Sequence, residues 1–394
     1  MTTVLPPEPL ADRAKTITPF ETGKGTPAGR YLRSFWQPIA RSVDLEVGRA
    51  VPITIMSEEL TLFRGESGRP VVMDPLCPHR LTKLSIGNVE GDAIRCQFHG
   101  WKFGADGRCV EAPLQTPALI ERVTVGTRPV REKFGLIFVY LGEGPEPEFP
   151  DIVGYSRAHG LDIASAPILE SEVYRRYCNW YLNHENSMDL AHVPYTHALS
   201  ASPDLTRTGF SDDAAVVRDF TVERLEYGVR VEQVDDDGLH ARVTALFPNV
   251  MHLIIHMRIG TLENFYWRVP IDDDSHKGFG ISSIHTDEQG AREWRQTQQE
   301  LEEVAARYPL TEDCAAQILR GEKRLIDFVD HPKLQGIEDA LTQQGMRRIA
   351  DTGAQNLGRS DRAILQLRRM FLSRVADFIA GEPSVFDVWP TSLD

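Results

Sequence analysis

The sequence lacks an apolar run long enough to cross a membrane. No stretch approaches the roughly eighteen consecutive apolar residues that a transmembrane helix requires. The first residues, MTTVLPPEPLADRAK, also contain no apolar core of signal-peptide length. We therefore expect a soluble, cytoplasmic protein that does not act on or in a membrane.

The sequence also has fewer basic than acidic residues. The 394 residues include 43 Lys and Arg against 57 Asp and Glu, which gives a formal net charge of −14 at pH 7. Nucleic acids and anionic membrane surfaces attract basic proteins, so this balance argues against either as the main partner. The hydrophobic share of 41% is ordinary for a globular protein, and the length predicts two domains.

Cysteine is scarce, with five residues in the whole chain, which fits a reducing cytoplasm. Three of them, Cys109, Cys178 and Cys314, are scattered, and we interpret them as small buried hydrophobic side chains. The other two, Cys77 and Cys96, each lie two or three residues before a histidine.

These two cysteines begin the pairs Cys77-Pro78-His79 and Cys96-Gln97-Phe98-His99. Two thiolates and two imidazoles suit a tetrahedral zinc ion. They equally suit a 2Fe–2S cluster with two cysteines on one iron and two histidines on the other. Spacing alone does not separate these alternatives. Ordinary buried cysteines rarely have such neighbours as Gly100 and Trp101 beside them, so we favour a metal site.

A second group of candidate ligands lies in the stretch CNWYLNHENSMDLAHVPYTH. We predict a helix up to Val193, with Asp189 and His192 on one face. On an ideal helix His197 would lie about 140° from His192, so a regular helix would keep the two imidazoles apart. Pro194 should break the helix and let His197 turn back. Two imidazoles beside a carboxylate suggest a metal site, although a solvated polar helix end has the same composition.

Taken together, these stretches resemble a known family. CPHR, NVEGDAIRC and CQFHGWKF resemble the Rieske motif. The order N-W-x-L-x-x-E-N-x-x-D-x-x-H-x4-H resembles the mononuclear-iron segment of Rieske non-haem iron ring-hydroxylating oxygenases. GTPAGRYLRSFWQPIARSVDL and GRSDRAILQLRRMFLSRVADF resemble the phthalate-dioxygenase-like branch, which includes aryl-ether O-demethylases. The resemblance identifies the chain as the alpha subunit of a terminal oxygenase.

The resemblance implies a role for each candidate ligand. The 2Fe–2S Rieske cluster would be held by Cys77, His79, Cys96 and His99, and the mononuclear Fe(II) by His192, His197 and Asp339. In the family the iron-binding carboxylate comes from a late helix, where Asp339 matches the position. Glu338 is next to it, but successive helix residues point about 100° apart, so only one should face the iron. Asp189 would instead form an electron-transfer bridge between His192 and His99 of the neighbouring subunit.

The fold class that follows is α+β. It combines an N-terminal all-β Rieske domain with a helix-grip catalytic domain, whose antiparallel sheet is flanked by helices. Residues Gly142–Pro150, rich in Pro, Gly and Glu, mark the boundary. We predict an N-terminal arm at 1–35, the Rieske 2Fe–2S domain at 36–145 and the mononuclear iron domain at 146–394. Strands are expected at 52–56, 60–64, 70–74, 93–96, 136–140, 216–234, 241–247, 250–259, 265–270 and 280–285, and helical insertions within 291–328.

Candidate substrate contacts follow from one of these strands. Alternation over Asn249–Ile259 places His256 and Arg258 on the same face. This polar row has two interpretations, a solvated sheet face or a pocket wall in which Arg258 meets a substrate carboxylate. We take Arg258 and His256 from this strand, together with Asn186 from the stretch that contains His192, as the candidate substrate residues.

The resemblance also implies the reaction and the partners. Electrons from NAD(P)H would pass through a separate reductase, with or without a ferredoxin, to the cluster and then to the mononuclear iron. Together with O2 they would hydroxylate or dihydroxylate a small aromatic substrate, expected to be carboxylated, or O-demethylate a methoxy-aromatic. The chain has no dinucleotide or flavin motif, which makes the reductase a separate protein. Family subunits form head-to-tail homotrimers or stacked trimers. A Rieske electron-transfer protein without oxygenase activity is the alternative of another class.

Overall fold

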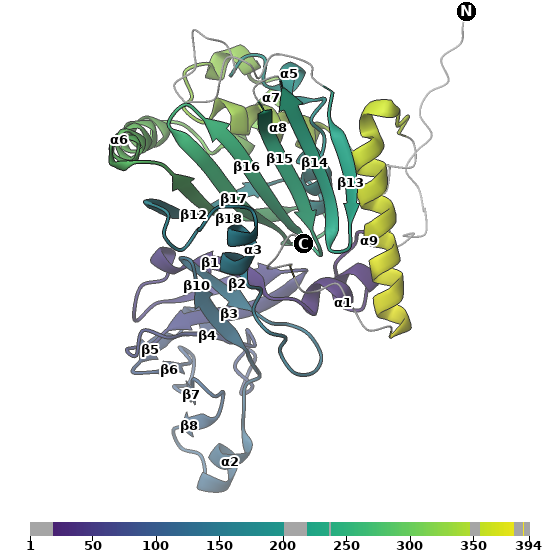
Figure 1. Cartoon of the computed structure of the whole chain (residues 1–394). Coiled ribbons are helices and arrows are strands. Elements are labelled where there is room, and N and C mark those ends of the chain that lie inside the picture. Colours follow the sequence, from purple (N-terminus) through teal and green to yellow (C-terminus); the bar gives the residue numbers. More distant parts are fainter. Residues whose placement is uncertain (1–18, 201–218, 236–237, 347–354, 382–388, 390–394) are drawn as a thin grey trace, which may run out of the picture.

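The structure is a computed structural model that describes residues 19–200, 219–235, 238–346, 355–381 and 389 (Figure 1). Two predicted segments lie partly outside these described residues. They are the N-terminal arm at 1–35, of which 1–18 are not described, and the start of the strand predicted at 216–234.

Three small antiparallel sheets make up the N-terminal part. Their orders are β1-β11-β10, β2-β3-β4-β9 and β5-β6-β7-β8. The elements are α1 (Pro27–Arg33), β1 (Gln37–Arg41), β2 (Ala50–Ile55), β3 (Glu58–Arg64), β4 (Pro70–Met73), β5 (Asn88–Glu90), β6 (Ala93–Arg95), β7 (Lys102–Gly104), β8 (Cys109–Glu111), α2 (Pro117–Arg122), β9 (Thr127–Arg128), β10 (Val130–Lys133) and β11 (Leu136–Val139). The five strands predicted here are confirmed. They form because their apolar residues either alternate between a buried and an exposed face or fill the core.

One seven-stranded antiparallel sheet, ordered β12-β18-β17-β16-β15-β14-β13, dominates the rest of the chain. Its strands are β12 (Ile168–Arg176), β13 (Thr221–Leu225), β14 (Gly228–Asp235), β15 (Gly238–Leu246), β16 (Val250–Met257), β17 (Gly260–Pro270) and β18 (His276–His285). The strand predicted at 216–234 is in fact two strands joined by a tight turn. We did not predict β12, whose sequence ILESEVYRR is largely exposed and shows no apolar alternation.

Helices flank this sheet, as predicted (Figure 1). They are α3 (Ile152–Ala158), α4 (Trp180–Asn186), α5 (Val193–Thr196), α6 (Glu288–Ala305), α7 (Thr311–Leu319), α8 (Leu334–Gly345) and α9 (Arg362–Ala380). Helix α9 runs beside the edge strand β13, and α7 packs against α8. The insertions expected within 291–328 are α6, α7 and a short 3-10 turn. The α+β fold class is therefore confirmed.

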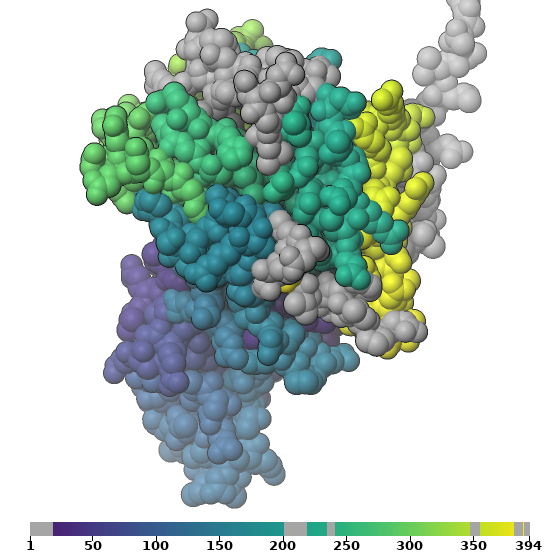
Figure 2. Space-filling view, in the orientation of Figure 1, coloured from purple at the N-terminus to yellow at the C-terminus, as the bar shows by residue number. Residues whose placement is uncertain are grey.

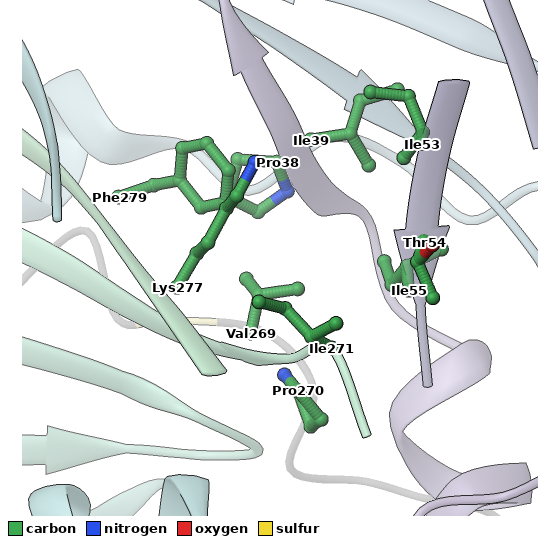
Figure 3. A pocket seen from close by; sticks show the side chains of 10 residues that line it. All are labelled: Pro38, Ile39, Ile53, Thr54, Ile55, Val269, Pro270, Ile271, Lys277 and Phe279. Atoms are coloured by element: carbon green, nitrogen blue, oxygen red, sulfur yellow. The ribbon is translucent and has the colours of Figure 1, made fainter. Parts of the chain in front are cut away.

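The two parts of the chain share one continuous hydrophobic core. Strands β1 and β2 meet the ends of β17 and β18 at a junction lined mainly by apolar side chains (Figure 3). The cavity there measures about 10 Å³, room for about one water molecule and far too little for a substrate. Across the junction the Met56 N–H donates to the Pro270 carbonyl at 2.8 Å. The predicted division at residues 145 and 146 stays a prediction.

The space-filling view shows the N-terminal sheets as a narrower end below a broader body (Figure 2). The sheet β5–β8 and α2 lie at the far tip of that end, whereas α5, α7 and α8 lie at the opposite end of the molecule (Figure 1). Within the described part of the chain, no helix is long and apolar enough to cross a membrane.

Candidate metal centres

The segment that carries the two candidate histidines is not the helix that we predicted. Helix α4 ends at Asn186 rather than near Val193. Turn bonds follow, with the Met188 N–H donating to the Glu185 carbonyl at 2.9 Å. Pro194 lies in the first turn of α5 and begins a helix instead of breaking one. A proline in that position loses only a donor that would have no partner anyway, so it is well tolerated there.

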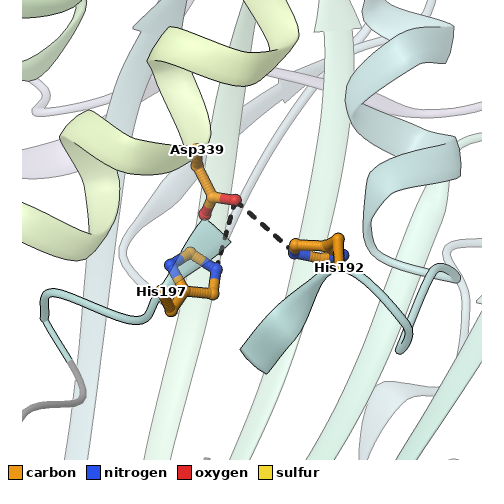
Figure 4. Close-up of side chains that lie close together, drawn as sticks. All are labelled: His192, His197 and Asp339. Carbon is orange, nitrogen blue, oxygen red and sulfur yellow. Dashed lines mark ion pairs between the residues drawn. The ribbon is translucent and has the colours of Figure 1, made fainter. Parts of the chain in front are cut away.

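Three predicted ligands nevertheless come together. His197 Nε2 lies 3.5 Å from Asp339 Oδ1, and His192 Nε2 lies 3.9 Å from the same oxygen (Figure 4). One ligand atom from each of the three residues lies within 4.8 Å of the other two. Asp339 reaches this cluster from α8, far along the sequence. Two imidazoles and one carboxylate arranged in this way fit a single Fe(II) with open positions for other ligands.

Each imidazole of this cluster is held through its other nitrogen. His197 Nδ1 lies 3.1 Å from Oε2 of Glu338, a carboxylate that also accepts a 2.6 Å hydrogen bond from the hydroxyl of Ser200. His192 Nδ1 contacts the backbone carbonyl of Asp189. These contacts leave both Nε2 atoms on the side of Asp339. Metal-binding histidines are commonly held in this way, by a carboxylate or carbonyl on the far nitrogen.

The two imidazoles differ in their electrostatic surroundings. Burial lowers the pKa of His192. Burial also opposes protonation of His197, but the hydrogen bond to Glu338 and the charge of Asp339 outweigh it and raise the pKa of that ring. A metal ion replaces the proton on the ligand nitrogen, so the acidic groups that favour a proton at His197 would favour a cation as well.

The carboxylate of Asp189 lies elsewhere than we expected. It accepts a 3.0 Å hydrogen bond from the Ala191 N–H, and only the backbone carbonyl of Asp189 contacts His192. The turn between α4 and α5 explains this difference, because a regular helix would have put the Asp189 side chain over His192 instead. The bridging role between subunits stays a prediction.

The candidate substrate residues do not lie together. Asn186 lies at the cluster, where its amide donates to Asp339 Oδ1 at 3.1 Å. His256 instead pairs with Thr261, and Arg258 pairs with Glu293 on α6. Arg258 is also largely exposed, so the structure does not support its placement in a pocket wall. The solvated-face interpretation describes this end of β16 better.

The four residues of the first motif lie on two loops at the tip of the N-terminal part. Gly100 has a left-handed backbone, with φ of 73°, which closes the loop so that the Cys96 N–H bonds to the Trp101 carbonyl at 2.8 Å. The rings of His79 and His99 are 4.5 Å apart between centroids, and His79 stacks on Trp101. Both cysteines are buried and His99 is exposed.

The donor set at this tip fits a cluster with two metal atoms. Burial raises the pKa of the Cys77 thiol to about 11, so a thiolate here needs a cation beside it. Nδ1 of His79 is buried and has no hydrogen-bond partner among the described residues. Among the described residues, His192, His197 and Asp339 lie close enough together to share one ion. The four residues at the tip do not form such a group of three. Ligands divided between two irons explain that spread better than one tetrahedral zinc does.

The chain is similar to known proteins in sequence and in fold. Residues 35–129 match the Rieske [2Fe-2S] domain family. The chain is 30% identical over 373 residues to the 5,5'-dehydrodivanillate O-demethylase oxygenase subunit of Sphingobium sp. SYK-6, across 91% of this chain and 79% of that protein. It is 29% identical to the phenoxybenzoate dioxygenase subunit alpha of Ectopseudomonas oleovorans, across 90% of this chain and 83% of that protein. The terminal oxygenase of carbazole 1,9a-dioxygenase from Novosphingobium sp. KA1 has the same fold, with a TM-score of 0.61, 20% identity and coverage of 88% and 93%.

The Rieske domain match and the similarity to an oxygenase subunit over most of both chains define a Rieske-type terminal oxygenase. More particularly, the chain belongs to the Rieske non-haem iron ring-hydroxylating oxygenases, as an oxygenase alpha subunit related to the phthalate and phenoxybenzoate dioxygenases and to an O-demethylase. It is an oxidoreductase that uses O2. The electron-transfer protein without oxygenase activity is thereby set aside.

Proposed function

We propose that this subunit holds a Rieske 2Fe–2S cluster and a mononuclear Fe(II), and that it oxygenates a small aromatic substrate. The cluster ligands are Cys77, His79, Cys96 and His99, and the iron ligands are His192, His197 and Asp339. The observation that carries the proposal is the convergence of two histidines and a distant aspartate within 4.8 Å, in a chain of this family.

Fe(II) held at this site would supply the activation of O2, with electrons from the cluster. The chain itself would supply three ligands, and a site of two histidines and one carboxylate has further coordination positions for O2 and substrate. Glu338 and the Asp189 carbonyl fix which nitrogen of each histidine faces the metal. Asn186 holds one oxygen of Asp339 and so orients the carboxylate.

For the substrate we propose a carboxylated aromatic compound, which is hydroxylated or dihydroxylated. One relative is named for phenoxybenzoate, which is a carboxylated aromatic. O-demethylation of a methoxy-aromatic is the second candidate, favoured by the similarity to a dehydrodivanillate O-demethylase across most of both chains. Both reactions can use one iron site and differ in which carbon the pocket holds near it.

The partners we propose are a separate reductase, fed by NAD(P)H, and two further copies of this chain. The tip that carries the cluster exposes large apolar side chains, with Leu81 67% and Phe98 53% exposed. Such side chains suit a protein contact. The tip and the iron site lie at opposite ends of the molecule, so electrons would cross from one subunit to the next in a head-to-tail ring (Figure 1).

The proposed function is tested by supplying the purified protein with NADH and a reductase from a related system. Aromatic acids and methoxy-aromatics are then screened while O2 uptake and product mass are followed. We expect uptake coupled to a product that gains oxygen or loses a methyl group. Absence of substrate-dependent uptake across the screen, in protein with full iron content, would contradict the proposal.

A further inference from the structure

One buried cation contacts the residue that follows Asn186 of the iron site, and it has no matching anion among the described residues. The side chain of Arg268, on β17, is 6% exposed. One of its terminal nitrogens donates to the hydroxyl of Ser187 at 3.1 Å. Its Nε and its other terminal nitrogen have no hydrogen-bond partner among the described residues. Within the same described residues, no carboxylate lies at ion-pair distance from it. An uncompensated buried charge is costly, so a ligand is expected to complete it.

Two tyrosine rings hold the guanidinium of Arg268 in place. Its central carbon lies 5.5 Å from the ring centroid of Tyr174 and 5.0 Å from that of Tyr266. These rings lie over β18 where Gly278 and Gly280 have no side chain. A Cβ at Gly278 would come within 2.1 Å of the Tyr174 ring, and one at Gly280 within 2.6 Å of the Tyr266 ring. The two glycines therefore leave room for the tyrosine rings, and the rings fix the position of the arginine side chain.

Among the described residues, the nearby acidic groups and carbonyls accept no hydrogen bond from Arg268. Glu172 beside this cluster is bound by the hydroxyl of Tyr266 and by Ser282. Arg176 offers a contrast, since it also lies over Tyr174 but donates to the carbonyls of Arg175 and Gly336 and to the Thr311 hydroxyl. Both terminal nitrogens of Arg176 thus have acceptors in the chain, whereas Nε and one terminal nitrogen of Arg268 have none among the described residues.

A second unpartnered polar side chain lies close by. His184, on α4, is fully buried, and neither of its nitrogens has a hydrogen-bond partner among the described residues. It is three residues from Ser187 and so shares a face of the helix with it. Burial and the charge of Arg268 lower the pKa of His184 to about 3. The ring is therefore neutral at neutral pH and can donate one hydrogen bond.

The position of this cluster relates it to the iron site. Ser187, which Arg268 contacts, directly follows Asn186, whose amide bonds to the iron-site Asp339. A planar guanidinium with two free donors matches the two oxygens of a carboxylate. We propose that Arg268 binds the carboxylate of the substrate, with His184 as a further donor and Ser187 holding one guanidinium nitrogen, and so places the aromatic ring toward the iron. This inference rests on the proposed function and adds the residue that selects acidic substrates.

The test uses holoenzyme kept anaerobic and titrated calorimetrically. The probes are 4-methoxybenzoate, 3-phenoxybenzoate and biphenyl-3-carboxylate, each compared with its neutral carboxamide. We expect at least one acid to bind about tenfold or more tightly than its amide. The preference should vanish in Arg268→Gln and fall in Arg268→Lys, which keeps the charge but loses the fork. It should remain in Arg258→Gln, the matched exposed arginine on the neighbouring strand end.

The inference is overturned if no acid is preferred over its amide, or if the preference survives in Arg268→Gln. Should that variant fail to fold, Ser187→Ala and Arg268→Lys decide, and an unchanged preference in both overturns it. Iron content separates this outcome from failure of the proposed function. Holoenzyme with both metal centres and no acid preference defeats only the role of Arg268, whereas a chain that binds no mononuclear iron defeats the proposed function itself.

Discussion

Glu338 and Asp339 are neighbours in α8, and their carboxylates lie at opposite nitrogens of the same imidazole. Glu338 Oε2 is 3.1 Å from Nδ1 of His197, and Asp339 Oδ1 is 3.5 Å from its Nε2. Glu338 is buried, while Asp339 remains partly exposed toward the space shared with His192. One carboxylate thus orients the ring, and the other is available to a metal.

The first prediction concerns the iron-facing carboxylate. Asp339→Ala should lose the mononuclear iron and all turnover while the Rieske cluster remains, because a site with two histidines alone binds Fe(II) weakly. Metal analysis combined with the visible spectrum checks this. Full iron and activity in Asp339→Ala would move the ligand role to Glu338.

The second prediction concerns the orienting carboxylate. Glu338→Gln keeps the size of the side chain but weakens its hold on His197, so Fe(II) affinity should fall by about 10–100-fold without loss of the cluster. Competition with a chelator of known affinity measures the change. Gln344→Ala, on the same helix but with its amide donating to the Glu312 carbonyl, serves as a control that should keep its iron. Equal iron retention in Glu338→Gln and the native protein would contradict the orienting role.

A third prediction concerns the cluster at the tip. Cys77→Ser and His99→Ala should each abolish the visible absorbance of the Rieske cluster and NAD(P)H-driven turnover, since the new side chains cannot replace the lost ligands. Cys109→Ser is the matched control, because Cys109 is a buried cysteine of the same part of the chain but is not a proposed ligand. An intact spectrum in either ligand variant would refute the assignment.

The fourth prediction concerns assembly. Asp189→Asn should keep both metal centres yet lose most turnover, if the carboxylate bridges to His99 of a neighbouring subunit in a trimer or a stack of two trimers. Sedimentation gives the assembly state. Comparing the rate of cluster reduction with the rate of product formation shows whether electron transfer between the two metal centres is the step that slows. An active monomer would defeat the ring, and full activity in Asp189→Asn would defeat the bridge.

Much of this site was predictable from the sequence, because Cys-His spacings and the His192–His197 pair carry chemical information locally. The path of the backbone was less predictable. The apolar positions of residues 178–193 predict one helix, whereas turn bonds after Asn186 end it early. Ser and Asp in that stretch compete for backbone hydrogen bonds and favour turns, which an apolar pattern does not register.

Arg268 shows a different limit of prediction. Within the strand sequence FYWRVP it is one polar residue among apolar ones, and nothing local shows that its charge is buried without an acidic partner among the described residues. That fact depends on β12 and β18, which place Tyr174 and two glycines around it from distant parts of the chain. By contrast Arg258, predicted from strand alternation alone, lies at an exposed end beside Glu293. Alternation predicts the face of a strand but not what covers it.

The most direct test of the central claim is the metal and sulfide content of the purified chain. A Rieske cluster together with a mononuclear site predicts three irons and two acid-labile sulfides per chain, since the cluster alone accounts for two of each. We expect a ratio approaching three irons per chain after reconstitution with Fe(II). Two irons per chain under the same conditions, or one zinc without sulfide, would contradict the account.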